Sequence, residues 1–408
     1  MAILVKPIRE EFEINDFEFG ILNGVAFSLL YTFIGIPLAW LADRKSRKNI
    51  IAIGTGFWSL MTFICGLATG FYSLFAARMG VGVGEAALSP PAHSLLSDYF
   101  PKEKLPTIMA IFTLGIPVGI GISYSLGGWV YGLLAEHILV SFPLIGAVKP
   151  WQATFMIVGL PGIILALLIS RIHEPERTGL LTINHTTNPL SIKQVFLYLL
   201  DHKTVYFNIF ASIACLSIVG YGFMMWFVEH MSRSFEQPAH KLSQNFGIMY
   251  SIAGSIGTLS GAALSTLLLK KGFADAGIRL IFIVAIAWFL PAISAPLMSS
   301  LKGAQLMAVP YIFLLNSYFG VSIAALQIIT PNQMRAQVSA VLLFMTNVFG
   351  LVIGPMIIGF LSDKVFDDAG IQSLGISLSV IGGIFCGLAA LLLLLAMKPY
   401  QRLLASRQ

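Results

Sequence analysis

The 408-residue chain is 57% hydrophobic and 11% charged, and it carries 38 glycines and a formal net charge of +6. Soluble domains contain about 25% charged residues, so this composition excludes a water-soluble globule of this size. Lipid must solvate most of the surface. The net positive charge is typical of loops beside anionic lipid, and we expect no nucleic-acid partner.

Apolar runs long enough to cross a bilayer recur along the chain. A helix that spans a bilayer core of about 30 Å needs roughly 20 apolar residues. Eleven such runs lie at about 19–42, 50–70, 72–97, 105–134, 151–170, 204–228, 243–268, 280–301, 303–328, 336–362 and 374–397. Glycines and prolines inside them predict kinks and close helix contacts, not breaks. The sequence therefore predicts an all-α polytopic membrane protein.

The distribution of basic residues predicts the topology. Of the 25 lysines and arginines, 17 fall in loops on one side of the predicted membrane and 7 on the other. The positive-inside rule makes the richer side cytoplasmic, so the C-terminus is inside and residue 1 is outside. The opening residues MAILVKPI are too short for a span or a signal. We expect a first helix that is largely missing from this chain, twelve spans in the intact protein, and a location in the inner cell membrane.

Charges at the ends of the first complete span have different expected roles. The acidic run at 10–18 is expected to form a solvated external loop. The loop after the span reads GIPLAWLADRKSRKNI, and Asp43 precedes four basic residues. The basic residues are ordinary membrane anchors, whereas a carboxylate at this edge can pair in one conformation and separate in another.

This loop resembles the signature G-x-x-x-D-R-x-G-R-K of the major facilitator superfamily. The charged positions of the signature are occupied by Asp43, Arg44, Arg47 and Lys48, and Ala39 and Ser46 replace two glycines. The resemblance implies a conformational latch that contains Asp43, Arg44 and Arg47, with Asp98 at the end of the fourth helix as a partner. Surface charges that only fix topology are the alternative.

The run at 72–97 is the fourth span when the expected missing first helix is counted, and it carries two charges at membrane depth, Arg78 and Glu85. Seven residues separate them, which places them on one helix face about 10 Å apart along the axis. The glycines between them are expected to leave that face open. Such charges normally face a bundle interior or a wet cavity. Arginine stays charged and binds phosphate or carboxylate, whereas glutamate can titrate.

We hypothesise that Glu85 carries the coupling proton and that Arg78 neutralises either Glu85 or an anionic headgroup. A purely structural ion pair is the alternative, and His93 is a second candidate for the proton carrier. The segment R-x-G-x-G-x-G-E-A, followed by paired prolines and S-D-Y-F-P, resembles the spinster branch of the superfamily, which is associated with lysolipids and sphingosine-1-phosphate. A related G-E-A segment occurs in organic-anion/proton symporters.

The resemblance covers nearly the whole chain and implies the major facilitator fold, with two six-helix bundles around a central cavity that rock in alternating access. The expected parts are an N-terminal bundle at 1–172, a cytoplasmic linker at 173–203 and a C-terminal bundle at 204–408. Within the linker, IKQVFLYLLDHK has helical spacing. It predicts either an amphipathic helix on the inner membrane surface or a plain connector.

The C-terminal half offers polar residues but hardly any buried charge. Tyr221, Trp226 and Asn316 are candidate substrate-binding residues together with Arg78 and Glu85, although such residues more often join helices. The segment 347–364 predicts close packing with a flexible point, and Asp363 at its end is expected to be solvated. Neither a disulfide nor a metal site is indicated, because all three cysteines lie within spans: Cys65, Cys215 and Cys386.

These features predict a proton-coupled secondary active transporter of a lysolipid or sphingolipid-like amphiphile. A proton-coupled transporter of small organic anions of the sugar-acid type is the alternative. An enzyme or an ATP-driven pump is disfavoured, because no phosphate loop, zinc-ligand spacing or nucleophile elbow is present, and no cofactor is expected. The lack of a repeated filter loop disfavours a channel. The expected partners are the substrate, protons and membrane lipids around a monomer.

Overall fold

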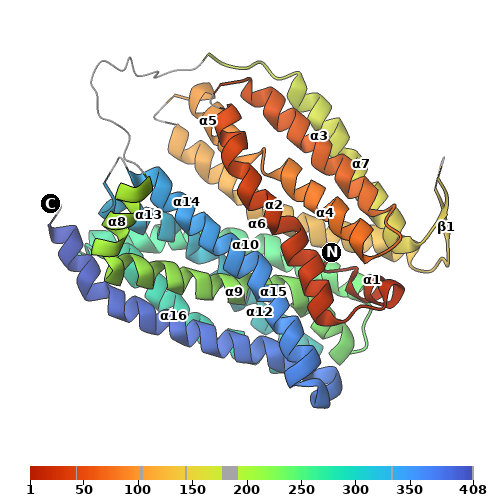
Figure 1. Cartoon of the computed structure of the whole chain (residues 1–408). Helices are drawn as coiled ribbons and strands as arrows, with labels where there is room; N and C mark the ends of the chain where they lie inside the picture. The colour runs from red at the N-terminus through yellow and green to blue at the C-terminus, as the bar shows by residue number, and fades with distance from the viewer. Residues whose placement is uncertain (43, 102–103, 143–144, 177–191, 332–333, 407–408) are drawn as a thin grey trace.

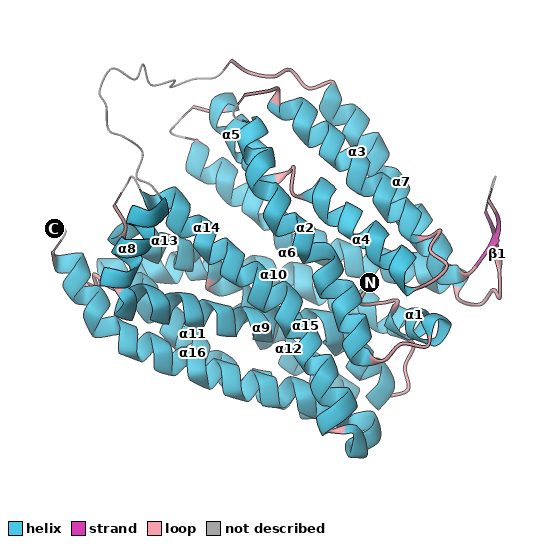
Figure 2. Cartoon of the chain, viewed as in Figure 1, coloured by secondary structure: helices cyan, strands magenta, loops and turns pink. Residues whose placement is uncertain are grey.

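The computed structural model describes the chain except residues 43, 102–103, 143–144, 177–191, 332–333 and 407–408 (Figure 1). Helices make up nearly all of the described chain (Figure 2), and the strands within it are a short antiparallel pair, β1 (Val140–Phe142) and β2 (Gly146–Val148). Ten described helices are long and apolar enough to cross a membrane. The prediction of an all-α polytopic membrane protein is confirmed.

The elements form two bundles. The N-terminal bundle comprises α1 (Val5–Phe12), α2 (Asp16–Ala42), α3 (Arg47–Cys65), α4 (Phe71–Glu85), α5 (Ser89–Tyr99), α6 (Leu105–Leu134) and α7 (Pro150–Ser170). The C-terminal bundle comprises α8 (Ile192–Asp201), α9 (Lys203–Ser234), α10 (Ala239–Lys270), α11 (Ala276–Ser294), η1 (Ala295–Leu297), α12 (Leu301–Ser317), α13 (Phe319–Ile329), α14 (Arg335–Met345), η3 (Thr346–Ile353), α15 (Gly354–Phe360), η4 (Leu361–Val365), η5 (Asp367–Gln372) and α16 (Ser373–Ala405).

The fourth span is not the continuous helix that its apolar run predicts. It divides into α4 and α5, which are joined by a turn at residues 86–88. The physical reason is the proline pair that follows. Pro90 and Pro91 have no backbone N–H, so the carbonyl groups of Ala86 and Ala87 lose their helical partners. Glu85 is consequently the last residue of a half-helix inside the membrane.

The C-terminal bundle packs around α9, which is the most deeply buried of the candidate spans. The ring of Phe223 stacks on Phe227 at 4.1 Å and on Tyr311 at 3.7 Å between centroids. The outer helix faces instead expose large apolar side chains, among them Ile164, Leu165, Leu167 and Leu168 on α7. Such exposed apolar faces fit contact with lipid, not water.

The two bundles touch at two places. At one, α6 packs against α10, and at the other, α2 packs against η3 and α15. We name the two ends of the molecule after residues: the Asp16 end, where α2 begins, and the Arg47 end, where α3 begins. In the half of α2 nearest Asp16, a Cβ added to Gly24 would lie 2.5 Å from the Leu351 carbonyl oxygen. Near the Arg47 end of the same helix, a Cβ on Gly35 would meet nothing within 4 Å.

The α6–α10 pair follows the same pattern. A Cβ on Gly121 would lie 1.9 Å from Ser251 Oγ, and one on Gly128 would lie 2.1 Å from Ser243 Oγ, both toward the Asp16 end. A Cβ on Gly115, nearer the start of α6, would meet nothing within 4 Å. The bundles are therefore in contact at the Asp16 end, and their ribbons diverge toward the end where α5 and α8 lie (Figure 1).

Candidate functional site

Glu85 lies where the two bundles face each other. Its side chain is exposed at the end of α4. Tyr31 of α2 interacts with Glu85 and with Ser89, and Tyr221 of α9 lies within electrostatic range of Tyr31 and Glu85. The structure thus brings together two of the candidate residues, one from each bundle. Half-helix ends inside a membrane carry substrate and ion sites in transporters, because their backbone groups are free to bind.

Arg78 lies on the same helix as Glu85, two turns away, and is not paired with it. Its guanidinium carbon lies 5.3 Å from the centre of the Phe27 ring, and its Nε is buried with no hydrogen-bond partner among the described residues. No salt bridge within 4 Å joins Arg78 to Glu85 in the described part of the chain. A buried N–H of a charged group is costly to leave unsatisfied.

The expectation that glycines open the surface between Arg78 and Glu85 is wrong. A Cβ on Gly82 would lie 2.2 Å from the Phe27 carbonyl oxygen, and one on Gly84 would lie 2.6 Å from the Trp58 backbone nitrogen. These glycines let the backbone of α4 approach α2 and α3 closely. The glycine pattern therefore serves packing within the N-terminal bundle.

The candidate substrate residues of the C-terminal bundle separate into two groups. Tyr221 and Asn316 are half-buried, and Asn316 interacts with the Tyr250 hydroxyl while its amide donates to the Ile312 carbonyl at 2.9 Å. Trp226 is fully buried, and its indole N–H donates to the Pro355 carbonyl at 2.9 Å. Trp226 therefore holds α15 against α9 in this conformation and is not free to meet a substrate.

The proposed latch residues take different positions at the Arg47 end. Arg47 is 1% exposed, its Nη1 donates to Ser94 Oγ at 3.0 Å, and it forms an ion pair with Asp98. Arg44 is exposed and stacks on the Trp40 ring at 4.0 Å. Asp43 lies outside the described residues. The structure thus brings together the Arg47–Asp98 pair and leaves Arg44 outside it.

Glu174, which the sequence did not single out, completes this cluster. Its carboxylate accepts from the Arg47 backbone N–H at 2.7 Å, from Arg47 Nε at 3.3 Å and from the Ser46 hydroxyl. Burial alone would raise the pKa of this carboxyl, but the hydrogen bonds from Ser46 and Arg47 outweigh it and lower the pKa below its ordinary value. The available signal was the position of Glu174 just beyond the end of α7, on the same side as Arg47.

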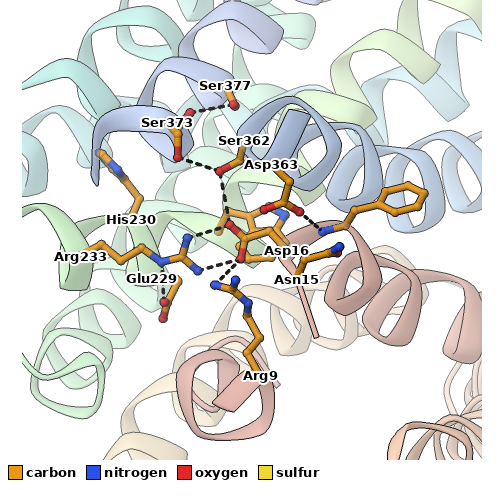
Figure 3. A network of polar contacts seen from close by, with 12 residues as sticks. Arg9, Asn15, Asp16, Glu229, His230, Arg233, Ser362, Asp363, Ser373 and Ser377 are labelled. Atoms are coloured by element: carbon orange, nitrogen blue, oxygen red, sulfur yellow. Dashed lines mark hydrogen bonds and ion pairs between the residues drawn. The ribbon is translucent and has the colours of Figure 1, made fainter. Parts of the chain in front are cut away.

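A second charged network joins the two bundles at the Asp16 end (Figure 3). Asp16 is 1% exposed and accepts from Arg233 Nη1 and Nη2 at 2.7 and 2.8 Å and from Arg9 Nη1 at 2.7 Å. The Phe17 backbone N–H donates to Asp363 Oδ2 at 2.7 Å. The expectation that Asp16 is solvated is therefore wrong, because Arg233 of the opposite bundle holds it away from water. Asp363 is half-buried and also has a partner in the opposite bundle.

Comparisons with known proteins agree with this architecture. The sequence matches the Major Facilitator Superfamily over residues 1–355. An MFS-type efflux pump of Mycolicibacterium smegmatis is 26% identical over 98% of this chain and 89% of its own length. The sphingosine-1-phosphate transporter SPNS2 of Mus musculus is 25% identical over 90% of this chain and 66% of its own. A probable L-galactonate transporter of Escherichia coli is 26% identical over 70% and 61%.

Among solved structures, a bacterial homologue of the human lysosomal transporter spinster, described as inward-facing and unoccupied, superposes with a TM-score of 0.80. It is 25% identical and covers 98% of this chain and 93% of its own. The chain therefore belongs to the major facilitator superfamily, is a multi-pass membrane transporter, and resembles the spinster branch of that family.

Proposed function

We propose that this protein is a proton-coupled carrier that moves a lysolipid or sphingolipid-like amphiphile by alternating access. The observation that carries the proposal is the broken fourth span. It presents the Glu85 carboxylate where the bundles meet and keeps the half-buried Arg78, whose Nε is buried, on the same helix without a salt bridge among the described residues. One group can exchange a proton and the other can hold an anion.

The arginine suits an anionic headgroup. A guanidinium is always charged, and its fork of N–H groups matches phosphate and carboxylate. The facing bundle supplies a hydroxyl group at Tyr221 and an amide group at Asn316, and the Tyr250 hydroxyl lies beside that amide. A polar group in one bundle and a mainly apolar wall in the other fit a molecule with a charged head and an acyl chain. The similarity to the sphingosine-1-phosphate transporter supports this substrate class.

The glutamate suits proton coupling because its surroundings change with conformation. Glu85 lies near Tyr31 of its own bundle and Tyr221 of the other. Rocking of the bundles would move Tyr221 relative to Glu85 and change the water and hydroxyl groups that the carboxylate meets. A group whose neighbours differ between two states binds protons differently in each, and this difference links a proton gradient to transport.

The conformation described here corresponds to opening at the Arg47 end. Contact at the Asp16 end fits this state, and so does the similarity to an inward-facing structure. The excess of basic residues at the Arg47 end makes that end cytoplasmic under the positive-inside rule. We propose that the protein is a monomer in the cell membrane, that its C-terminus is cytoplasmic, and that the linker between its two bundles runs from 173 to 203 and includes α8.

A carrier of small organic anions is the second candidate. The similarity to the probable L-galactonate transporter favours it, and Arg78 would hold a sugar-acid carboxylate as readily as a lipid phosphate. The two candidate substrates differ in the side chains that the C-terminal bundle must offer them. A hydrophilic acid needs polar partners there, whereas an acyl chain needs an apolar wall.

The test uses the purified chain in liposomes with labelled lysolipid and, separately, labelled galactonate. With an imposed pH gradient, wild type should accumulate lysolipid. Glu85→Gln should lose the response to the gradient while keeping exchange of substrate, and Glu136→Gln, at the end of α6, serves as the matched control. Arg78→Lys should weaken the affinity for the substrate, because lysine keeps the charge but loses the fork.

If transport by Glu85→Gln still depended fully on the pH gradient, the assignment of Glu85 as the proton site would be refuted. Transport of galactonate without any movement of lysolipid would refute the lipid substrate and establish the second candidate.

A further inference from the structure

In the network at the Asp16 end, Arg233 and Asp16 each have more than one charged partner. Arg233 uses its two terminal nitrogens for Asp16 of the opposite bundle and its Nε for Glu229 Oε1 of its own helix, at 2.8 Å. Asp16 in turn accepts from Arg9, which belongs to its own bundle, at 2.7 Å. The pair that crosses between the bundles, Arg233 with Asp16, is therefore flanked on each side by a local partner (Figure 3).

Glu229 is only partly used in this state. It is 3% exposed, and its Oε2 is buried and has no hydrogen-bond partner within the described chain. A buried carboxylate oxygen without a donor is unfavourable, because it has lost water and gained nothing in return. Glu229 precedes Arg233 by one helical turn on α9, so the two stay within reach whatever the bundles do.

We propose that Glu229 is the alternative partner of Arg233: when the bundles separate at the Asp16 end, the forked nitrogens of Arg233 move from Asp16 to both oxygens of Glu229. The inference rests on the proposed alternating access and names a positioning residue for it. Asp16 keeps Arg9 after the exchange, and Arg233 gains Glu229 Oε2. Neither bundle is left with an unpaired buried charge, which would otherwise strongly oppose opening.

The surroundings of Glu229 leave room for this movement. A cavity of about 430 Å³ lies beside Glu229 and Arg233, and its other lining residues are Lys6, Arg9, Glu10, Glu13, Ile14 and Ser232. The side chain of Arg233 can therefore turn without displacing a packed core. Lys6 pairs with Glu10 at 3.9 Å on the exposed face of α1.

The other charged and titratable neighbours do not offer Arg233 the same exchange. The two ring nitrogens of His230 are engaged, Nε2 with the Pro296 carbonyl at 2.7 Å and Nδ1 with Ser234 Oγ at 3.3 Å. Asp363 accepts from the Phe17 N–H of the opposite bundle, so this contact must itself break on opening. Glu229 is the described carboxylate that lies on the same helix as Arg233 and already accepts from it.

Two substitutions should shift the opening equilibrium in opposite directions. Asp16→Asn weakens the contact that closes this end, so the open population should rise. Glu229→Gln removes the carboxylate that receives Arg233 after opening, so the open population should fall. A hydrogen bond to a charged group changes such a ratio by about tenfold or more. A merely structural role for Glu229 would not produce a shift opposite to that of Asp16→Asn.

The measurement is pulsed electron paramagnetic resonance on the full chain in nanodiscs. Spin labels replace Tyr72 and Ile371, which are exposed on opposite bundles at the Asp16 end, and alanine replaces the native cysteines, which are all buried. Ser232→Ala is the matched control, because it lines the same cavity without charge. We expect the fraction of molecules with the longer distance between the two labels to rise in Asp16→Asn, to fall in Glu229→Gln and to stay unchanged in Ser232→Ala.

The proposal is overturned if Glu229→Gln matches wild type, if it shifts in the same direction as Asp16→Asn, or if no variant shows a second distance. Should Glu229→Gln fail to fold, Arg9→Gln carries the same test, because it removes the partner that Asp16 keeps after opening and should also reduce the long distance. The distances need no substrate. A failure of lysolipid transport with the expected distances would therefore refute the proposed substrate and leave the exchange standing.

Discussion

A methyl group at position 24 should open the Asp16 end. Gly24 lies on α2 where it packs against η3, and a Cβ there would be 2.5 Å from the Leu351 carbonyl oxygen and 3.1 Å from the Val352 Cα. The atoms it meets belong to the backbone, which cannot turn aside as the tip of a flexible side chain can. Gly24→Ala therefore forces α2 and η3 apart, and with them the two bundles.

The expected size of the shift follows from the cost of overpacking. Extra methyl groups in a well-packed core cost about 1–3 kcal/mol. This strain exists only while the bundles touch, because opening removes the contact. Since each 1.4 kcal/mol changes an equilibrium tenfold, the ratio of open to closed molecules should rise roughly 5- to 140-fold. The helix propensity gained by replacing glycine with alanine is about 1 kcal/mol and is equal in both states.

Gly35→Ala provides the matched control, because it makes the same change in the same helix at a position where a Cβ meets nothing within 4 Å. The spin-label pair at Tyr72 and Ile371 reports the opening. A second pair at Ile172 and Leu200, both exposed at the Arg47 end, should show a shorter distance as the first grows longer. Identical distance distributions for Gly24→Ala and Gly35→Ala would refute the reasoning.

Three further predictions concern single contacts. Asp98→Asn should lower the free energy of unfolding in denaturant by about 3 kcal/mol, because it leaves the buried Arg47 with one carboxylate fewer; a loss within error of zero would contradict the burial of this pair. Because the folded state lowers the pKa of Glu174, its contacts with Ser46 and Arg47 contribute fully to stability above the ordinary pKa of the carboxyl group. This contribution is lost only as the pH falls through the lower pKa of the folded state. The melting temperatures of wild type and Glu174→Gln should therefore differ by a constant amount from about pH 8 to about pH 5.5 and converge in stronger acid, whereas convergence near neutral pH would reject the assignment. Tyr124→Phe removes the hydrogen bond from α6 to the Met224 carbonyl of the opposite bundle and should raise the open-to-closed ratio about fivefold, unless the spin-label distances stay as in wild type.

Lipid solvation explains why the spans could be predicted from sequence. A helix in a bilayer must be apolar along its whole length, so composition within a window of about 20 residues carries the information. Ten of the eleven predicted runs are continuous enough to count as candidate spans, and the exception is the one broken before Pro90 and Pro91. Of the two alternatives left open for the linker segment, the structure has the helix, as Ile192–Asp201, with Val195 buried and Phe196 exposed.

The partners of the charged residues could not be predicted in this way. Asp16 and Arg233 are 217 positions apart in the chain, and each lies at a span end, where a charge ordinarily meets water. Nothing in the composition near either residue separates a solvated charge from a paired one. A weaker signal existed in Glu229 and Arg233, which are four residues apart within one apolar span, because two charges at that spacing on a buried helix must satisfy each other or a third group.

The two charged clusters differ in which helices they join, and this decides which of them can hold a conformation. Arg47 and Asp98 belong to the N-terminal bundle, and Glu174 lies just beyond the end of its last helix, α7. Their contacts can therefore persist while that bundle moves as a rigid body. Asp16 and Arg233 belong to opposite bundles, so their contact cannot survive separation of the bundles at that end. The Arg47 cluster therefore stiffens one bundle, whereas the contact between Asp16 and Arg233 must break if the bundles separate at the Asp16 end. Under the proposed alternating access this break recurs in every cycle, which is the reason for the proposed replacement partners, Arg9 for Asp16 and Glu229 for Arg233.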